Sequence, residues 1–512
     1  MQESYSKNYL NIYFYQILSI VLGFMSLFVV VPYLSSDKTT YGIYSVCTSV
    51  TVFLSYADLG FLGAGMKYAA ESFSKNDREM EMKLVGFSHF VLFILITIFS
   101  IGFLYLSFNP QILISGILPG IQENIAHNLL LILAIFSPTI ILQRLLQMIF
   151  GIRLQDYIFQ RIVIIGNLVK IVSVFYFFEY RKYDIVGYFL FLQLVNLIVA
   201  IVGVLLAKKK YDYDFKLLVR YFTFSKEMFN KTKALAFSGI VVTISWVIYY
   251  EMDSFAIGKL LGANQVAIYA IGFTILTFFR SLLGVFFSPF SARFNHFIGA
   301  GKKEELKNFY LHVVKITFPI VVFPILAVVF LAEPIIISWV GIEYQAAVEI
   351  MKWLVFCNIL AFISYPAGML MLAEEKLKII YMLSVFMPVF YWCGIFFTLS
   401  TLGLKSFAIF KAIVFLISGL FYLFYTLNFL QISLYDFFKK NILPYLPAII
   451  ILCLMMYNCN SIFIDGKDKI NLVLNAGIVG FGIATAIGVS LFTVSYLRDY
   501  VQGMVEIILK KQ

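Results

Sequence analysis

The stretch Leu129-Leu-Leu-Ile-Leu-Ala-Ile-Phe136 is apolar at every position, and similar runs recur along all 512 residues. Of the whole chain, 61% is hydrophobic and 13% is charged, against about 45–50% and 25% in soluble domains. Each run approaches the roughly 20 residues that a helix needs to cross the hydrocarbon core. A membrane β-barrel would instead alternate apolar and polar residues in segments of about ten. The sequence therefore predicts an all-α polytopic membrane protein and excludes a water-soluble fold.

Hydropathy along the chain predicts about fourteen transmembrane helices. They lie at residues 9–33, 41–66, 84–108, 128–150, 160–179, 184–207, 235–258, 264–290, 310–332, 346–372, 377–398, 404–430, 442–460 and 471–495. Lys and Arg concentrate in the connections on the side of the N-terminus, so the positive-inside rule places both termini in the cytoplasm. The connections leave little room for a soluble catalytic domain, and we expect no enzyme.

The largest basic cluster, from Lys208 to Lys233, separates the first six predicted helices from the next six. We therefore predict an N-terminal six-helix lobe at residues 1–207, a basic cytoplasmic linker at 208–234, a C-terminal six-helix lobe at 235–430, and an additional helix pair with a cytoplasmic tail at 431–512. A shift of 225 residues places Tyr41-Gly-Ile-Tyr-Ser-Val46 on Val266-Ala-Ile-Tyr-Ala-Ile271. Internal repeats of this kind are typical of transporters with a binding site near the middle of the membrane.

Charged side chains inside the predicted spans are candidates for function, because a charge near the bilayer centre costs at least ~2.5–3.5 kcal/mol. The cations are Arg144, Lys170, Arg280, Lys315, Lys352 and Lys411, and the acids are Asp58, Glu251 and Asp253. The excess of cations favours an anionic ligand. The forked donors of Arg suit the oxygens of a diphosphate, while Lys contributes a compact charge.

Each group of charges has an alternative role. Lys170, Lys315, Lys352 and Lys411 can snorkel to the interface and anchor their helices. Arg144, more than a turn beyond Pro138, and Arg280, well inside its span, are the stronger candidates for lining a cavity.

The three acids are candidates for binding a coupling proton or sodium ion, because low dielectric disfavours a charged carboxyl. In the alternative, Asp58 pairs with a neighbouring cation, and Glu251 and Asp253 are solvated near the outer end of their span.

Short polar motifs stand near the ends of the predicted helices. They are Tyr56-Ala-Asp-Leu-Gly60, Ser74-Lys-Asn-Asp-Arg-Glu79, Glu251-Met-Asp-Ser-Phe-Ala-Ile-Gly258, Val266-Ala-Ile-Tyr269, Gly301-Lys-Lys-Glu-Glu-Leu306 and Gly341-Ile-Glu-Tyr-Gln-Ala-Ala347. Together, over nearly the full length of the chain, they resemble the Wzx-type polysaccharide flippases of the multidrug/oligosaccharidyl-lipid/polysaccharide exporter superfamily.

The resemblance implies two six-helix lobes in a V shape around a cavity, with two further C-terminal helices. It implies a flippase that carries undecaprenyl-diphosphate-linked oligosaccharide units to the external leaflet by alternating access, for O-antigen, capsule or related polysaccharide biosynthesis. The implied location is the bacterial inner membrane. The implied partners are the lipid-linked oligosaccharide, membrane lipids, and polysaccharide polymerase and assembly proteins.

Other functions have weaker support in the sequence. Asp212-Tyr-Asp214 has the acidic spacing of some metal-dependent glycosyltransferases, but it lies in a basic loop, and we expect a solvated loop and no metal site. A phosphate-binding Gly-Lys-Ser/Thr loop is absent from the sequence, which argues against an intrinsic ATPase, and we expect no cofactor and no nucleic-acid partner. A multidrug exporter of related fold remains the main alternative, ahead of a membrane polysaccharide polymerase or a scaffold without transport.

Overall fold

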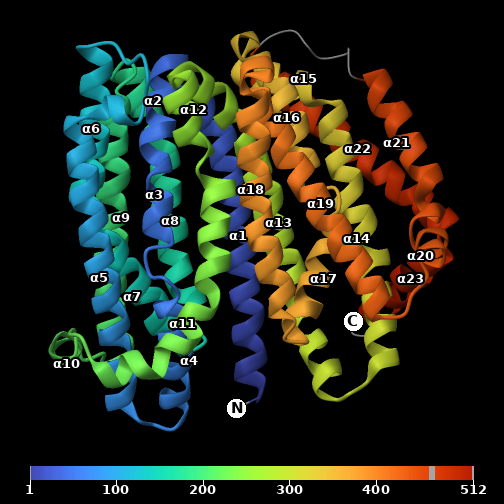
Figure 1. Ribbon diagram of the computed structural model, residues 1–512, viewed down its shortest axis with the longest axis horizontal. Coiled ribbons are helices and arrows are strands. Elements are labelled where there is room, and N and C mark those ends of the chain that lie inside the picture. The colour runs from blue at the N-terminus through green and yellow to red at the C-terminus, as the bar shows by residue number, and fades with distance from the viewer. Residues whose placement is uncertain (1, 460–466, 510–512) are drawn as a thin grey trace. The chain divides into compact units, whose positions relative to one another are not determined.

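The computed structural model describes residues 2–459 and 467–509, and every regular segment in these two ranges is helical (Figure 1). Within them, 11 helices are long and apolar enough to cross a membrane, and the count rises to 13 when each of two bent helix pairs is taken as one span. The prediction of an all-α polytopic membrane protein is confirmed. The remaining predicted span, at residues 41–66, does not form one continuous helix.

The chain divides into two compact units, Met1–Ala267 and Ile268–Gln512, which we call the N-terminal unit and the C-terminal unit. The α-helices of the N-terminal unit are α1 (Gln2–Leu34), α2 (Lys38–Ser49), α3 (Thr51–Ser55), α4 (Phe61–Ser74), α5 (Arg78–Phe108), α6 (Ile121–Phe136), α7 (Thr139–Ile152), α8 (Asp156–Val174), α9 (Ile185–Tyr211), α10 (Phe215–Arg220), α11 (Lys226–Trp246) and α12 (Asp253–Leu261). The π-helical segments Phe175–Tyr180 and Val247–Glu251 extend α8 and α11. Helix α13 (Ala263–Gly299) begins in this unit and continues into the next.

The C-terminal unit contains the rest of α13 and the helices of the C-terminal pair. Its further α-helices are α14 (Lys303–Phe330), α15 (Ala332–Val340), α16 (Ala346–Phe356), α17 (Ala361–Ala373), α18 (Leu377–Leu402), α19 (Lys405–Phe429), α20 (Leu434–Asn441), α21 (Leu446–Cys459), α22 (Lys469–Thr493) and α23 (Ser495–Leu509). Helices α21 and α22 pack against each other, α21 also contacts α14, and α22 also contacts α15 (Figure 1). The predicted additional helix pair is thus attached to the C-terminal unit.

The second predicted span is interrupted between α3 and α4. Leu59 and Gly60 have φ angles of 47° and 81°, in the left-handed region that a right-handed helix cannot include. Gly60 adopts this conformation easily because it lacks a Cβ. The prediction of a single helix over 41–66 was therefore wrong, and α2, α3 and α4 replace it.

Two predicted spans are bent. Helices α6 and α7 meet at 43°, and α16 and α17 meet at 42°. Pro138 lies at the first bend and has no N–H to donate to the carbonyl of Ala134. The hydroxyl of Ser137 donates to that carbonyl instead, at 3.2 Å. The bend thus keeps its backbone hydrogen-bonded, as an apolar environment requires.

The division between the units falls after the predicted linker 208–234. Helix α11 packs against α4 and α5, and α12 packs against α2. The predicted linker itself contains the end of α9, all of α10 and the first residues of α11. Contacts of the following helices therefore place residues 235–267 with the N-terminal unit, although the hydropathy pattern assigned them to the second lobe.

A buried ion pair joins several helix ends of the N-terminal unit. Arg153, just after α7, lies 2.9 Å from Glu81 of α5, with side chains only 7% and 1% exposed. The guanidinium also lies over the rings of Phe73, Tyr211 and Tyr213, at 4.8, 5.0 and 5.4 Å from their centroids. Such a pair is costly to break, because removal of one partner leaves a buried charge. It fixes the ends of α4, α5, α7 and α9 to one another.

Candidate functional site

The interruption at Tyr56–Gly60 is the centre of the candidate site in the N-terminal unit. Oδ2 of Asp58 accepts a hydrogen bond from the backbone N–H of Leu62 at 3.2 Å, and the Asp58 carbonyl accepts one from Phe61 at 2.9 Å. The carboxylate therefore stabilises the first turn of α4, where backbone N–H groups have no helical partner and the helix dipole is positive. This contact gives Asp58 a structural role at the break.

Arg144 approaches the other side of the same interruption. It is half-buried on α7, and its guanidinium donates to the carbonyl of Ser55 at 3.3 Å and to Oε1 of Gln147 at 3.2 Å. Ser55 is the last residue of α3, where carbonyl groups lack helical partners and carry partial negative charge. The described residues engage two of the five N–H groups of the guanidinium. Three donors remain for a ligand.

Glu251 contacts the interruption from the π-helical end of α11. Its Oε1 accepts hydrogen bonds from the hydroxyl of Tyr56 at 3.4 Å and from Nε1 of Trp246 at 3.3 Å. The Trp246 ring stacks on Tyr250 at 4.2 Å between centroids. π-Helical segments widen the helix locally and are frequent at functional sites. Glu251 is thus held in a polar and aromatic setting beside the break.

Asp253 lies at the start of α12 and is only 1% exposed. The alternative in which Asp253 is a solvated residue near the outer end of its span is therefore wrong. Glu251 is half-buried and also differs from a freely solvated residue.

Three predicted site residues thus meet at one place in the N-terminal unit. Asp58 belongs to the interruption, Arg144 contacts Ser55, and Glu251 contacts Tyr56. Sequence reasoning missed Gln147 and Trp246, which complete the contacts of Arg144 and Glu251. The only signal for either residue was a polar side chain or indole inside an apolar segment.

Lys170 belongs to a second polar group of this unit. It is half-buried on α8, and its ammonium donates to Oδ1 of Asn196 at 2.6 Å and of Asn167 at 3.4 Å. Asn196 lies on α9, so the contact joins two helices. Lys170 is therefore fixed by amide groups and does not reach freely toward an interface, as the snorkelling alternative requires.

In the C-terminal unit, Lys411 is fully buried on α19. Its Nζ lies 5.4 Å from the ring centroid of Phe273 and 5.3 Å from that of Tyr391. The electron-rich faces of aromatic rings attract a cation and replace part of its lost hydration. With 0% exposure, Lys411 reaches neither water nor lipid, and snorkelling is wrong for this residue.

The other three cations of the C-terminal unit have different surroundings. Arg280 is half-buried on α13. Lys315 lies over the ring of Tyr496 in α23 at 4.5 Å, and its carbonyl accepts from the Tyr445 hydroxyl at 2.7 Å. Lys352 is half-buried on α16. Lys315 thus faces the C-terminal helices.

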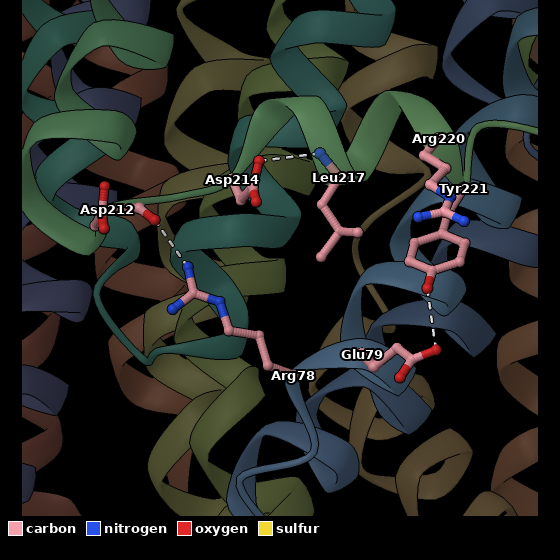
Figure 2. Close-up of a pocket in the computed structure, with 7 residues that line it drawn as sticks. All are labelled: Arg78, Glu79, Asp212, Asp214, Leu217, Arg220 and Tyr221. Atoms are coloured by element: carbon pink, nitrogen blue, oxygen red, sulfur yellow. Dashed lines mark hydrogen bonds between the residues drawn. The ribbon is translucent and has the colours of Figure 1, made fainter.

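The Asp212-Tyr-Asp214 motif lies at an open hollow of about 640 Å³ at the start of α5 (Figure 2). Asp214 accepts from the backbone N–H of Leu217 at 3.0 Å and begins α10, while Arg78 donates to the carbonyl of Asp212 at 2.8 Å. Glu79 accepts from the hydroxyl of Tyr221 at 3.0 Å (Figure 2). The polar groups of the hollow therefore hold the connection between α9 and α11 against α5.

Among the described residues, no group of three or more His, Cys, Asp or Glu side chains is placed to hold a metal ion. In the hollow, the carboxylate of Glu79 accepts a hydrogen bond from Tyr221 and that of Asp214 accepts one from Leu217. The carboxylates of Glu79, Asp212 and Asp214 do not form a group that could hold a metal ion. The metal interpretation of Asp212 and Asp214 gains no support from the geometry.

Comparison with known proteins identifies the architecture. A protein-family model described as MatE matches residues 239–398. An inward-facing multidrug resistance MATE transporter of the MOP superfamily is 15% identical, with a TM-score of 0.65 over 81% of this chain and 94% of its own. The lipid II flippase MurJ, in an inward closed conformation, is 16% identical, with a TM-score of 0.66 over 95% of this chain and 99% of its own. This is the fold of the MOP-superfamily transporters.

A third solved structure of this fold is a MOP-superfamily transporter from Pyrococcus furiosus, described as having a binding pocket of reverse polarity that suggests a different function. It is 15% identical, with a TM-score of 0.59 over 83% of this chain and 96% of its own. A search of curated protein sequences gives no match. The chain thus has a transporter fold shared by multidrug exporters and a lipid flippase.

Proposed function

We propose that this protein is a flippase that carries undecaprenyl-diphosphate-linked oligosaccharide from the cytoplasmic to the external leaflet by alternating access, for O-antigen, capsule or related polysaccharide biosynthesis. The observation that carries the proposal is the sign of the charges within its helices. All six predicted intramembrane cations are buried or half-buried, namely Arg144, Lys170, Arg280, Lys315, Lys352 and Lys411. Of the three acids, Asp58 is used to cap a helix.

A positive interior suits the chemistry of this substrate. A diphosphate and sugar hydroxyls cannot enter hydrocarbon unless protein or water replaces their hydration, while the polyprenyl tail remains in lipid. Arginine binds phosphate oxygens through parallel N–H donors. We propose that Arg144, with its three remaining donors, and Arg280 each contact the diphosphate during the transport cycle, with the four lysines as further candidates.

The extent of structural similarity also supports a lipid-linked substrate. The MurJ structure aligns with 95% of this chain and the inward-facing MATE structure with 81%. On this proposal the protein lies in the bacterial inner membrane with both termini in the cytoplasm, where polysaccharide polymerase and assembly proteins are its functional partners.

An ion-coupled multidrug exporter is the second candidate, and the MatE match over residues 239–398 favours it. For that function, Glu251 and the buried Asp253 would bind cationic drugs or the coupling ion. The two candidates differ in the charge of the substrate, so one transport assay with both substrate classes separates them.

The decisive experiment is reconstitution into proteoliposomes with a polyprenyl-diphosphate-linked oligosaccharide. Exposure of the sugar to an impermeant glycosidase reports translocation. We expect Arg144→Ala and Arg280→Ala to lower the rate at least about tenfold, because a charged hydrogen bond contributes roughly 1.5–3 kcal/mol. Arg181→Ala is the matched control, since Arg181 is exposed in a connection and pairs with Asp184 at 3.7 Å.

Wild-type translocation that the two variants abolish and the control retains supports the flippase. Absence of translocation for several lipid-linked sugars, together with uptake of a cationic drug, would instead establish the exporter.

Ion coupling is tested in the same vesicles by imposing proton or sodium gradients. We propose Glu251 as the first coupling candidate and Asp253 as the second, because the Asp58 carboxylate already accepts the backbone N–H of Leu62. Glu251→Gln keeps the shape of the side chain and removes its charge, so we expect transport to lose its response to the gradient. If Glu251→Gln and Asp253→Asn both leave transport and its gradient dependence unchanged, the coupling proposal fails.

A further inference from the structure

A small polar cavity lies inside the N-terminal unit, between the bend of α6 and α7 and the adjoining helices α3 and α9. It offers about 40 Å³ to the centres of water-sized molecules. Its polar lining consists of Thr51, Ser137, Thr139, Gln143, Gln193 and Asn196. A single water needs about 10–15 Å³ on this measure, so the cavity holds a few particles of that size and excludes a sugar or a lipid.

Two amide groups connect the ammonium of Lys170 to this cavity through hydrogen bonds. The ammonium donates to Oδ1 of Asn196 at 2.6 Å, and Nδ2 of Asn196 lies 3.5 Å from Oε1 of Gln193. The oxygen of Asn196 therefore accepts from Lys170, and the oxygen of Gln193 accepts from the NH₂ group of Asn196. The NH₂ group of Gln193 stands at the end of this series of hydrogen bonds. Hydrogen bonds in series polarise one another, so the NH₂ of Gln193 is a strengthened donor. Among the described residues this NH₂ group has no acceptor.

The bend adds donors from a second direction. Thr139 and Gln143 line the cavity from the first turns of α7, whose N-terminal end carries partial positive charge. Interrupted membrane helices commonly present such ends to anionic groups. Neither the hydroxyl of Thr139 nor the amide of Gln143 has a hydrogen-bond partner among the described side chains and backbone groups, so both are available to an occupant of the cavity.

Negative charge is absent from the lining. None of the residues that form the cavity is Asp or Glu, and Lys170 pairs with amides instead of a carboxylate. A metal cation would therefore be repelled. We propose that this cavity binds a small monovalent anion of the halide class, held by Gln143, Gln193 and Thr139 and neutralising Lys170. The cavity is too small for the transported substrate, and the bound halide adds an anion requirement to the N-terminal unit.

Thermal unfolding of the full-length protein in detergent tests this site, with chloride replaced stepwise by gluconate at constant ionic strength. We expect a saturable rise in the unfolding temperature with chloride or bromide. We expect Lys170→Met to weaken the apparent halide affinity at least about tenfold, because a charge-assisted network is lost. Lys352→Met is the matched control, since Lys352 is also half-buried in a helix but lies in the C-terminal unit.

A direct measurement keeps the proposal testable if Lys170→Met does not fold. Crystals of the wild type grown in bromide are expected to show anomalous density between Gln143 and Gln193, and Gln143→Leu is expected to reduce it. Equal stability in chloride and gluconate, or a bromide-free cavity that holds water alone, would overturn the proposal. An identical halide response in wild type and a folded Lys170→Met would also overturn it.

Discussion

The second span of the N-terminal unit and the first long helix of the C-terminal unit occupy equivalent positions in the repeat, yet only one of them is broken. Helices α2 and α13 begin at Lys38 and Ala263, which are 225 residues apart, the offset that aligns the two halves. At this offset Asp58 and Gly60 correspond to Leu283 and Val285. A capping carboxylate and a left-handed glycine end α3 and start α4, whereas two aliphatic residues continue α13.

The two units also differ in where an arginine lies relative to this helix. In the N-terminal unit the carbonyl of Ser55 is free at the break, and Arg144 reaches it from α7. In the C-terminal unit the residue at the position of Ser55 is Arg280 itself, inside an unbroken helix. By contrast, the bends of 43° and 42° occur in the fourth span of each half. The bends thus occur in both halves of the repeat, whereas the position of the arginine differs between the halves.

Among substitutions that test this comparison, Gly60→Ala is expected to have the largest effect on stability. A Cβ at position 60 would lie 2.7 Å from the carbonyl oxygen of Ala236, and φ is +81°. We expect the free energy of unfolding to fall by about 3 kcal/mol, from backbone strain and the clash together. Chemical denaturation in detergent micelles measures the change.

Gly284→Ala in α13 is the matched control, because a Cβ there meets no atom within 4 Å. We expect this variant to be more stable by about 0.5–1 kcal/mol, since alanine favours a helix over glycine. Effects of equal sign at positions 60 and 284 would show that the break does not distinguish the two helices.

A smaller effect is expected from removing the carboxylate of Asp58. Asp58→Ala leaves the N–H of Leu62 without its side-chain acceptor, so we expect the free energy of unfolding to fall by about 1 kcal/mol. Asp58→Asn retains an acceptor oxygen and is expected to lose much less. Thermal unfolding of the two variants in parallel measures the cap, and an equal loss for both would argue that charge, not hydrogen bonding, is the stabilising property.

The smallest expected effect concerns the hydroxyl of Tyr56. Tyr56→Phe removes the 3.4 Å hydrogen bond to Glu251 and keeps the ring, so we expect the free energy of unfolding to fall by about 0.5–1 kcal/mol. Tyr435→Phe, at a residue that is 70% exposed, serves as the control. A loss no greater than that of the control would show that Tyr56 does not fix Glu251 at the break.

The candidate site was predictable as a set of charges but not as an arrangement. The cost of a buried charge marks Arg144, Glu251 and Asp253 from the sequence alone. Hydropathy also predicts a span over 41–66, but it averages over residues and conceals the local signal of Asp58 and Gly60. The amide partners of Lys170 were missed for the same reason, because a few Asn and Gln side chains barely change the mean hydropathy of a span.

The sequence by itself determined that the chain is a polytopic helical membrane protein and where most of its spans lie, because transfer of a helix into lipid depends on a sum over neighbouring residues. Only the tertiary structure decided which side chains meet. Lys170 contacts Asn196 across 26 residues, Arg144 contacts Ser55 across 89, and Tyr56 contacts Glu251 across 195. Such contacts depend on the rotation and packing of whole helices, and hydropathy contains no information about either.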